Sequence, residues 1–294
     1  MTTIEPVRLI LVAMVGFVLS TAGTGLLVFY LKNRRILDRP NERSSHTIPT
    51  PRGGGIALLG AVVAAWVIDI GLSTGHGLSS AIILTASLAL GLVCFIDDLK
   101  GLKALPRLLA QCAAVAPGIW LISDQGGLFR NFLPLVLDLC ATGFLWLWFI
   151  NLFNFMDGID GITGVEISTI GIGIAGLVAT SVIAPPLLGP AVALVAASLG
   201  FLVWNWRPAR IFMGDVGSIP LGYLIGWLLI NASEGTAGHG TALVPCLILP
   251  AYYLSDASIT LGRRLLNREN IFRAHRQHFY QKAVIRGIGH ETVC

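Results

Sequence analysis

This chain has little charge: only 12% of its 294 residues are Asp, Glu, Lys or Arg, whereas 54% are hydrophobic and the mean hydropathy is +0.76. That composition excludes an ordinary soluble domain. Apolar runs of about 17–25 residues are typical of transmembrane helices. We predict nine, at 8–31, 53–71, 78–96, 105–122, 132–150, 161–181, 186–203, 215–232 and 241–262. Because these runs are too long for barrel strands, the predicted fold is all-α, a polytopic helical membrane protein.

Disulfide and zinc-binding patterns are also missing. The chain has five cysteines, and no CxxC motif or Cys/His spacing relates them, so we interpret them as small packed apolar residues. No cleavage site of small residues precedes Lys32, so we expect the first run to be a helix and not a signal peptide. Without an internal repeat or a separate soluble segment, we expect a single integral-membrane domain over 1–294.

Basic residues are unevenly distributed between the predicted loops. Four loops are poor in Lys and Arg: 72–77, 123–131, 182–185 and 233–240. They contain only Arg130, and Arg8 lies before the first run on the same side. The positive-inside rule therefore places the other loops in the cytoplasm and the N-terminus outside. The net charge of +4 then reflects topology and anionic partners, and it does not indicate nucleic acid.

A polar stretch at 151–166 lies between two apolar runs and contains Asp157, Asp160, two amides and three glycines. An unpartnered carboxylate in hydrocarbon costs about 2.5–3.5 kcal/mol, so we expect both aspartates at a membrane–water boundary, facing a polar site. Their spacing of three would put them on one face if the turn is helical, and Asn154 could join that face.

Two other predicted inner segments also carry acids. Asp97 and Asp98 end the third run, and adjacent residues point about 100° apart on a helix. One could act as a base while the other caps a helix or pairs with a lysine, or both could form a solvated helix end. Asp215 lies between Gly214 and Gly217, which suits a hard cation bridged to phosphates. The alternative is a helix N-cap.

The remaining inner segments are basic. Arg52 precedes the glycines at 53–55, where backbone N–H groups at a helix start suit an anion such as phosphate. The last segment is cationic, with Arg273, His275, Arg276 and His278. We interpret both segments as phosphate-binding, and the alternatives are a loop that only fixes topology and a basic patch on anionic lipid.

Four further residues are acidic or aromatic and lie within the predicted membrane runs or near their ends. Phe212 could stack on a flat ring or anchor the chain at the interface. Asp256 falls inside the ninth run and is either functional or bonded to a neighbouring helix. Asp69 and Asp138 lie near outer helix ends, and we expect no chemical role for them.

Acids from three inner segments and basic groups from two others would thus meet at one membrane face. That division favours a metal-assisted reaction between phosphate substrates, in which cations neutralise phosphates while a carboxylate handles the nucleophile. A transporter of an anionic solute is the competing class, but its charges are expected near mid-membrane depth on broken helices. Clustering at the boundary favours the enzyme.

The motifs resemble those of the polyprenyl-phosphate N-acetylhexosamine-1-phosphate transferase family, glycosyltransferase family 4. The matching units are PRGGG at 51–55, DD at 97–98, NLFNFMDGIDG at 151–161, FMGDVGS at 212–218 and HRQH at 275–278. They follow the order of the family over nearly the whole chain. The resemblance implies that undecaprenyl phosphate attacks the sugar-proximal phosphorus of a UDP-N-acetyl sugar, giving undecaprenyl-diphospho-sugar and UMP.

The resemblance also implies residue roles. Asp215 would bind Mg²⁺, with Mn²⁺ as the alternative, and Asp97 or Asp98 would deprotonate the lipid phosphate. Within the nucleotide site, Phe212 would stack on uracil, and Arg107 and His278 would contact the diphosphate. The predicted catalytic residues are Asp97, Asp98, Asp157 and His278, and the predicted substrate-binding residues are Arg52, Arg107, Asn154, Asp160, Phe212 and His275. Direct attack is favoured over a covalent aspartyl intermediate.

Within the family, the short loops and the histidine segment are most similar to enzymes that initiate O-antigen or cell-surface polysaccharide synthesis. The muramoyl-pentapeptide-phosphate transferase of peptidoglycan synthesis, which usually has a denser histidine run, is the alternative. Family members usually continue into a further helix, whereas this chain ends at Cys294, so we expect that helix to be absent. The expected location is the bacterial inner membrane, and a homodimer is compatible with the sequence.

Overall fold

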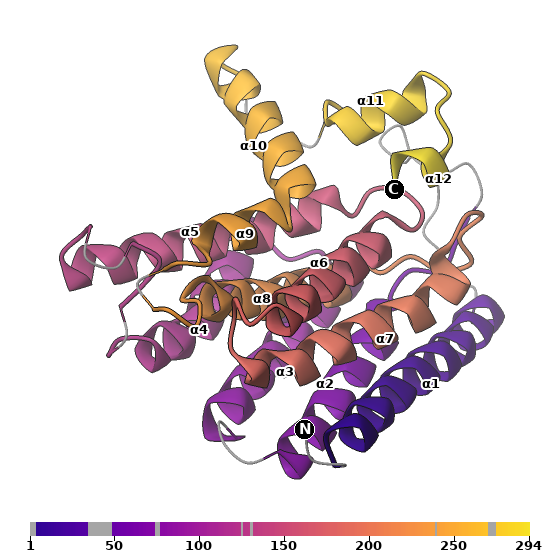
Figure 1. The fold of residues 1–294 in the computed structure, drawn as a ribbon. Coiled ribbons are helices and arrows are strands. Elements are labelled where there is room, and N and C mark those ends of the chain that lie inside the picture. The colour runs from indigo at the N-terminus through magenta and orange to yellow at the C-terminus, as the bar shows by residue number, and fades with distance from the viewer. Residues whose placement is uncertain are drawn as a thin grey trace.

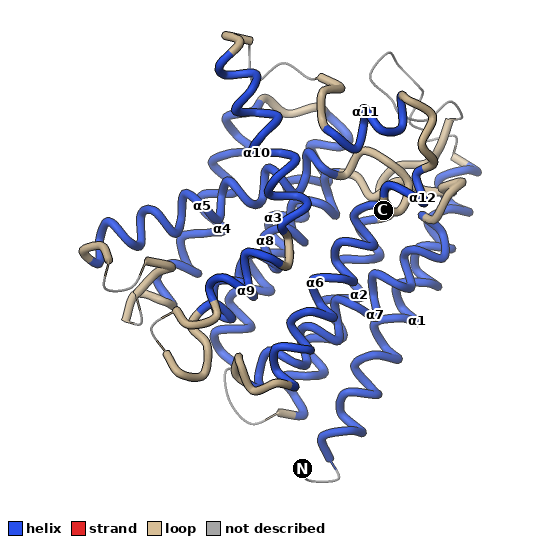
Figure 2. Tube along the Cα trace, turned by 45° about the horizontal axis from the view of Figure 1, so that its top comes forward, coloured by secondary structure: helices blue, strands red, loops and turns tan. Residues whose placement is uncertain are grey.

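The computed structural model describes residues 4–34, 49–73, 77–124, 126–129, 132–238, 240–269 and 275–294. Throughout these ranges the chain is built from helices without strands (Figures 1 and 2). Within the described ranges, eight helices are long and apolar enough to cross a membrane. They are α1 (Ile4–Asn33), α2 (Gly55–Leu72), α3 (Gly77–Lys100), α4 (Ala104–Leu121), α5 (Leu135–Met156), α6 (Ile162–Ala179), α7 (Leu188–Asn205) and α8 (Asp215–Ser233). The predicted all-α polytopic membrane fold is confirmed.

The ninth predicted run does not form one helix. It is divided into α9 (Leu243–Ile248) and α10 (Ala251–Leu266), with Pro250 between them. Proline has no N–H group, and its ring clashes with the carbonyl one turn earlier, so it ends or kinks a helix. In Figure 1, α10 leaves the direction of the bundle and projects above it. The short helices η1 (Pro185–Leu187), α11 (Phe279–Ile285) and α12 (His290–Val293) complete the described structure.

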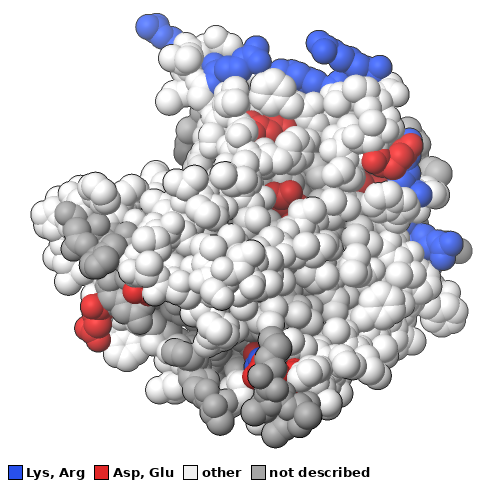
Figure 3. Space-filling view, in the orientation of Figure 1, with Lys and Arg blue, Asp and Glu red and all other residues white. Residues whose placement is uncertain are grey.

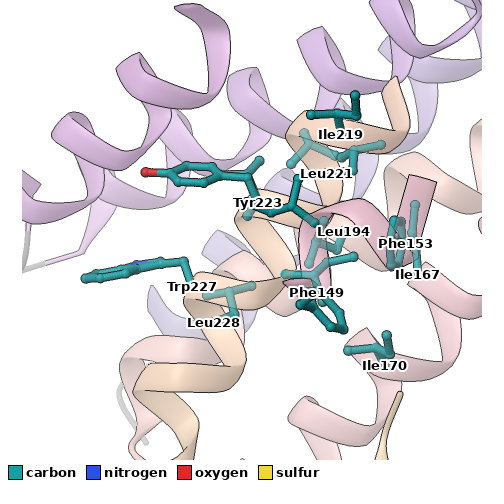
Figure 4. Close-up of a cluster of buried hydrophobic side chains, with 14 of the residues drawn as sticks. Phe149, Phe153, Ile167, Ile170, Leu194, Ile219, Leu221, Tyr223, Trp227 and Leu228 are labelled. Atoms are coloured by element: carbon teal, nitrogen blue, oxygen red, sulfur yellow. The ribbon is translucent and has the colours of Figure 1, made fainter. Parts of the chain in front are cut away.

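Helix α8 lies at the centre of the bundle, where it packs against α2, α3 and α5 and is buried along almost its whole length. A helix that is apolar on every side is typical of a protein core or a membrane span. Trp146 of α5 stacks on Tyr223 at 4.8 Å between ring centroids, and its Nε1 donates to the Tyr223 carbonyl over 3.0 Å. Figure 4 shows Tyr223 and Trp227 on one side of α8, with Phe149 and Phe153 nearby in the same core.

The outer surface is apolar over a wide area and charged at its edges. Large apolar side chains are exposed on α1 and α5, among them Ile10, Phe29 and Phe144. In Figure 3 most of the visible Lys and Arg side chains lie along the upper and right edges, next to a broad surface with few charges. Such a patch would be an aggregation liability in water, but it is the expected surface of a protein embedded in lipid.

Candidate active site

The candidate site forms where α2 and α8 begin. Gly55 and Gly217 lie so close together that a Cβ on either would overlap the backbone of the other. Gly214, with a φ of +77°, turns the chain into α8, and this is backbone geometry that favours glycine. The two helix starts therefore meet, and Arg52 lies beside Asp215.

The glycine N–H groups at the start of α2, which the sequence assigns to an anion, bind backbone carbonyls instead. The N–H groups of residues 53–55 donate to the carbonyl oxygens of Phe212 and Met213 over 2.9–3.0 Å. Phe212 in turn donates its own N–H to the Pro51 carbonyl over 2.8 Å. The prediction that these amides bind an anion is wrong, because they hold the first and fourth motifs together. The Arg52 guanidinium is the group of this motif that reaches the site.

Three carboxylates and two guanidinium groups form one connected cluster. Arg52 Nη2 lies 2.6 Å from Asp215 Oδ1 and 3.0 Å from Asp98 Oδ1. Arg107 Nη1 lies 3.1 Å from Asp215 Oδ2 and 3.2 Å from Asp97 Oδ2. The Asp97 side chain is 7% exposed and that of Arg52 is 43% exposed. The structure thus brings together five of the predicted residues, with the arginines nearer solvent than the acids.

The adjacent aspartates of α3 have different surroundings. Asp98 caps α8: its carboxylate accepts the N–H groups of Val216 at 3.0 Å and Asp215 at 3.4 Å. Asp97 Oδ1 accepts the Leu102 N–H at 2.6 Å. Asp97 Oδ2 is buried and accepts no hydrogen bond from the described residues, since Arg107 lies at ion-pair distance without hydrogen-bond geometry.

Asp215 is not the N-cap of its helix, so that alternative interpretation is wrong. Gly214 occupies the N-cap position and has no side chain that could accept a hydrogen bond. The Asp98 carboxylate, from α3, accepts the hydrogen bonds of the first N–H groups of α8 instead. The Asp215 carboxylate instead bridges Arg52 and Arg107. Each oxygen of the Asp215 carboxylate thus faces a positively charged guanidinium group. A metal ion bound to phosphate would place a positive charge beside the carboxylate in the same way.

Asp157 lies at the edge of this cluster. Helix α5 ends at Met156, and Asp157 starts an irregular turn before α6. Burial raises the pKa of Asp157 to about 6, although the Thr163 hydroxyl and Arg52 act in the opposite direction. Asn154, one turn earlier, accepts a hydrogen bond from Ser218 Oγ at 2.5 Å, which connects α5 to α8.

Asp160 does not share a face with Asp157, because the turn between them is not helical. Its Oδ2 accepts the Ala209 N–H at 3.1 Å, and its own N–H donates to His290 Nδ1 at 3.2 Å. Burial would raise the pKa of Asp160, but the adjacent His290 ring, whose Nδ1 lies 3.6 Å from Asp160 Oδ2, and the Ala209 N–H hold it below its ordinary value. Asp160 therefore ties the 157–161 turn to two other segments, and no described contact joins it to the cluster.

The histidine segment is also engaged away from the cluster. His278 Nδ1 lies 3.0 Å from Asp256 Oδ1, and the His275 ring stacks on His278 at 5.0 Å between centroids. Burial and the neighbouring Arg264 lower the pKa of His275 to about 4, so His275 is neutral near pH 7 and does not add to a cationic group. Arg273 lies outside the described residues.

The two outer aspartates hold structural contacts. Asp69 pairs with the buried Arg8, whose Nη1 lies 2.8 Å from Asp69 Oδ1. Asp138 accepts the N–H groups of Gly127 at 2.8 Å and Phe129 at 2.9 Å, which holds the loop before α5.

Several contributors were not predicted. The sequence assigns no role to Ser218 of the FMGDVGS motif, although its position four residues after Gly214 places it on the first turn of α8. Thr163, Tyr253 and Tyr280 were not singled out, because hydroxyl contacts between distant helices leave no local sequence pattern. Among the described residues, no three His, Cys, Asp or Glu side chains gather closely enough to form a metal cage by themselves.

The chain is similar to known transferases. The model of glycosyl transferase family 4 matches residues 80–233. A probable undecaprenyl-phosphate N-acetylglucosaminyl 1-phosphate transferase of Bacillus subtilis is 28% identical over 86% of this chain and 71% of its own length. A decaprenyl-phosphate N-acetylglucosaminephosphotransferase of Mycobacterium leprae is 30% identical over 98% of this chain and 80% of its own.

A second activity is represented among the relatives. A phospho-N-acetylmuramoyl-pentapeptide-transferase of Streptococcus sanguinis is 28% identical over 76% of this chain and 74% of its own length. The family match covers more than half of this chain and includes Asp97, Asp98, Arg107, Asp157 and Asp215. The chain therefore belongs to glycosyl transferase family 4 and is a phosphoglycosyltransferase with a helical membrane fold.

Proposed function

We propose that this chain transfers an N-acetylhexosamine 1-phosphate from a UDP-sugar to undecaprenyl phosphate and thereby initiates O-antigen or another cell-surface polysaccharide. The observation that carries the proposal is the cluster of three carboxylates bridged by two arginines at one end of the bundle. A phosphate oxygen of the lipid attacks the sugar-proximal phosphorus, the bond to the UMP oxygen breaks, and UMP leaves. A single direct displacement balances without a covalent enzyme intermediate.

Asp97 is the better candidate for the base that deprotonates the lipid phosphate. Both oxygens of Asp98 are used in capping α8, whereas Asp97 Oδ2 accepts no hydrogen bond from the described residues. A general base needs a lone pair within reach of the proton that it removes. In this arrangement Asp98 positions Arg52 and the start of α8, and Asp97 takes the proton.

Arg52 and Arg107 would bind the phosphates. Their guanidinium groups are more exposed than the acids that they cover, so they can turn from carboxylates to the phosphate oxygens of a ligand. Arginine suits such an exchange because its planar fork forms paired hydrogen bonds with either group. Phe212 and Asn154 lie on segments that adjoin the cluster and would contact the nucleotide, while His275, His278 and Asp160 would act at its periphery.

The residues present are compatible with Mg²⁺ or Mn²⁺. Magnesium is usually bound by one or two carboxylates together with substrate phosphates, and not by an all-protein cage. Asp215 provides a carboxylate whose two oxygens face the guanidinium groups of Arg52 and Arg107. Arg52 also pairs with Asp98 Oδ1, so a second carboxylate lies beside the first. A bound ion would neutralise the diphosphate as charge develops on the leaving UMP.

Lipid has space beside this cluster. An apolar groove of about 560 Å³ between α3 and α4 is lined mainly by alanine and other small side chains. It begins at Val93 and Ala110, about one turn from Asp97 and Arg107 respectively. The groove would accept part of a polyprenyl chain while the phosphate lies at the cluster. We further propose a bacterial inner-membrane location with this end of the bundle in the cytoplasm.

The test is UMP release by the purified chain with undecaprenyl phosphate, Mg²⁺ and a panel of UDP-N-acetyl sugars. Asp215→Asn should lower the rate by roughly a hundredfold or more, as expected for loss of a group that stabilises transferring phosphate. Asp124→Asn, in an exposed position on the loop after α4, is the matched control and should keep wild-type activity. Release should require both the lipid and the metal.

The sugar panel separates the alternatives. Release with UDP-N-acetylmuramoyl-pentapeptide alone would favour the peptidoglycan activity, which the similarity to the Streptococcus sanguinis protein supports. No release from folded protein with any donor would contradict the transferase proposal and favour transport.

A further inference from the structure

The turn that carries Asp157 is held at both ends by tyrosine hydroxyls from the C-terminal part of the chain. At the first end, Tyr280 of α11 donates its hydroxyl to the Phe155 carbonyl over 3.1 Å. At the second end, the Tyr253 hydroxyl lies 2.9 Å from Thr163 Oγ1, on the first turn of α6. The two tyrosines are 1% and 0% exposed, so neither hydroxyl bonds to bulk water instead.

The Tyr280 bond lies where a helix end lacks a partner. The last four carbonyls of a helix have no partner inside the helix, and α5 ends one residue after Phe155. Tyr280 satisfies one of those carbonyls. Gly158 lies so close to the Tyr280 hydroxyl that a Cβ would overlap it. The ring and the turn are therefore in direct contact on both sides of Asp157.

One acid on α10 joins the two tyrosines into a single unit. Asp256 lies three residues after Tyr253, on the same helix. Its Oδ1 accepts the Phe279 N–H at 2.9 Å and faces His278 Nδ1 at 3.0 Å, and its Oδ2 accepts the Tyr280 N–H at 3.0 Å. Asp256 is thus a structural acceptor that fixes α11 on α10, which resolves the role that its sequence left open.

We propose that Tyr253 and Tyr280 are positioning residues that set the place of Asp157 opposite the arginine–carboxylate cluster. This inference rests on the proposed function, in which Asp157 belongs to the transferase site. Arg52, Asp98 and Asp215 face Asp157 from the other elements, so a shift of the turn changes its distance to all three. A displacement of about 1 Å in such a site can cost on the order of a hundredfold in rate.

The experiment removes each hydroxyl and keeps each ring. Tyr253→Phe and Tyr280→Phe should each lower kcat for UMP release about tenfold, which corresponds to one lost buried hydrogen bond. KM for both substrates should stay within about twofold of wild type, because the loss concerns the arrangement for reaction and not binding. Tyr252→Phe is the matched control, since its ring is exposed and no described hydrogen bond uses its hydroxyl.

Thr163 tests whether Tyr253 acts through its hydroxyl partner. Thr163→Val should reproduce the loss, and Thr163→Ser should retain most of the activity because it keeps the hydroxyl. The double variant Tyr253→Phe with Thr163→Val should be no slower than Thr163→Val alone, because Thr163→Val already removes the bond to Tyr253 together with the hydroxyl contact to Asp157. Additive losses would show that Tyr253 does not act through Thr163 and would contradict this part of the proposal.

Two outcomes would overturn the inference as a whole. One is an unchanged kcat in both phenylalanine variants. The other is a loss of kcat that follows a fall in melting temperature and is equally large in Thr163→Ser, which would indicate a purely structural effect. Amide hydrogen exchange over residues 155–163 reports on the same contacts and does not depend on activity. It should be faster in Tyr253→Phe and Tyr280→Phe than in wild type, and unchanged in Tyr252→Phe. Failure of the wild-type protein to release UMP would instead contradict the proposed function.

Discussion

The arrangement of the cluster depends on the absence of a side chain at Gly214. Its φ is +77°, and a Cβ there would lie 2.9 Å from Asp98 Oδ2. Gly214→Ala should therefore strain the turn by about 1–3 kcal/mol and displace Asp98, with a loss of UMP release of roughly tenfold or more. The control is Gly60→Ala in α2, where no atom lies within 4 Å of the new Cβ and alanine is the better helix former. Equal activity of the two variants would contradict the prediction.

Asp157 should make stability depend on pH in a definite direction. Its pKa is raised by burial from 3.8 to about 6, so the folded state binds the proton more tightly than the unfolded state. Stability should rise as the pH is lowered through that window, from about 6 to about 4, and this contribution should be constant above it. Asp157→Asn abolishes the effect, because an amide has no proton to bind in this range.

The measurement is the difference in melting temperature between Asp157→Asn and wild type in detergent from pH 4 to pH 8. The variant should be relatively more stable near pH 7, and its advantage should shrink toward pH 4. Asp124→Asn controls for the change in net charge. A difference that does not vary with pH would show that Asp157 keeps an ordinary pKa.

The sequence singles out the clustered acids and Arg52 because polar residues that end apolar runs stand out against a hydrophobic background, whereas Arg107 is implied only by the family resemblance. The sequence does not distinguish Asp97 from Asp98, because the distinction depends on the amides of α8, more than a hundred residues away. For the same reason the glycines at 53–55 were assigned to a ligand, although their amides bind the backbone at Phe212 and Met213.

At the scale of elements, hydropathy locates the eight long helices because each is a continuous apolar run. The ninth run is equally apolar at its start but contains Pro250, and a hydropathy average does not register a missing N–H group. The break at Pro250 lets α10 leave the bundle direction and carry Tyr253 and Asp256 to the C-terminal helices (Figure 1).

Asp256→Asn should loosen α11 from α10 without unfolding the bundle. An asparagine turns an NH₂ group toward amide donors, so at least one of the bonds to Phe279 and Tyr280 is lost. A lost buried bond of about 1–3 kcal/mol predicts amide exchange at these two residues roughly 10–100-fold faster. Ser255→Ala, an exposed neighbour on the same helix, should leave exchange unchanged. Protection equal to wild type in both variants would contradict the anchoring role.

At the scale of the whole molecule, one end of the bundle collects the reactive groups. Helices α2, α3, α4, α5 and α8 each bring a site residue to this end or to an adjoining loop, and α8 is the buried axis around which they pack. Described Lys and Arg residues also gather at the edges of the molecule, above an apolar surface (Figure 3). The positive-inside rule then predicts that the site faces the cytoplasm.

Cysteine accessibility tests this orientation. Lys103 precedes α4 and Asp124 follows it, so the two positions should lie on opposite sides of the membrane. In a chain whose five native cysteines are replaced, a membrane-impermeant maleimide should label Asp124→Cys in intact cells and Lys103→Cys only after permeabilisation. Retained UMP release would show that both variants are folded. The reverse labelling would place the cluster outside, away from the cytoplasmic UDP-sugars, and would therefore contradict both the topology and the proposed reaction.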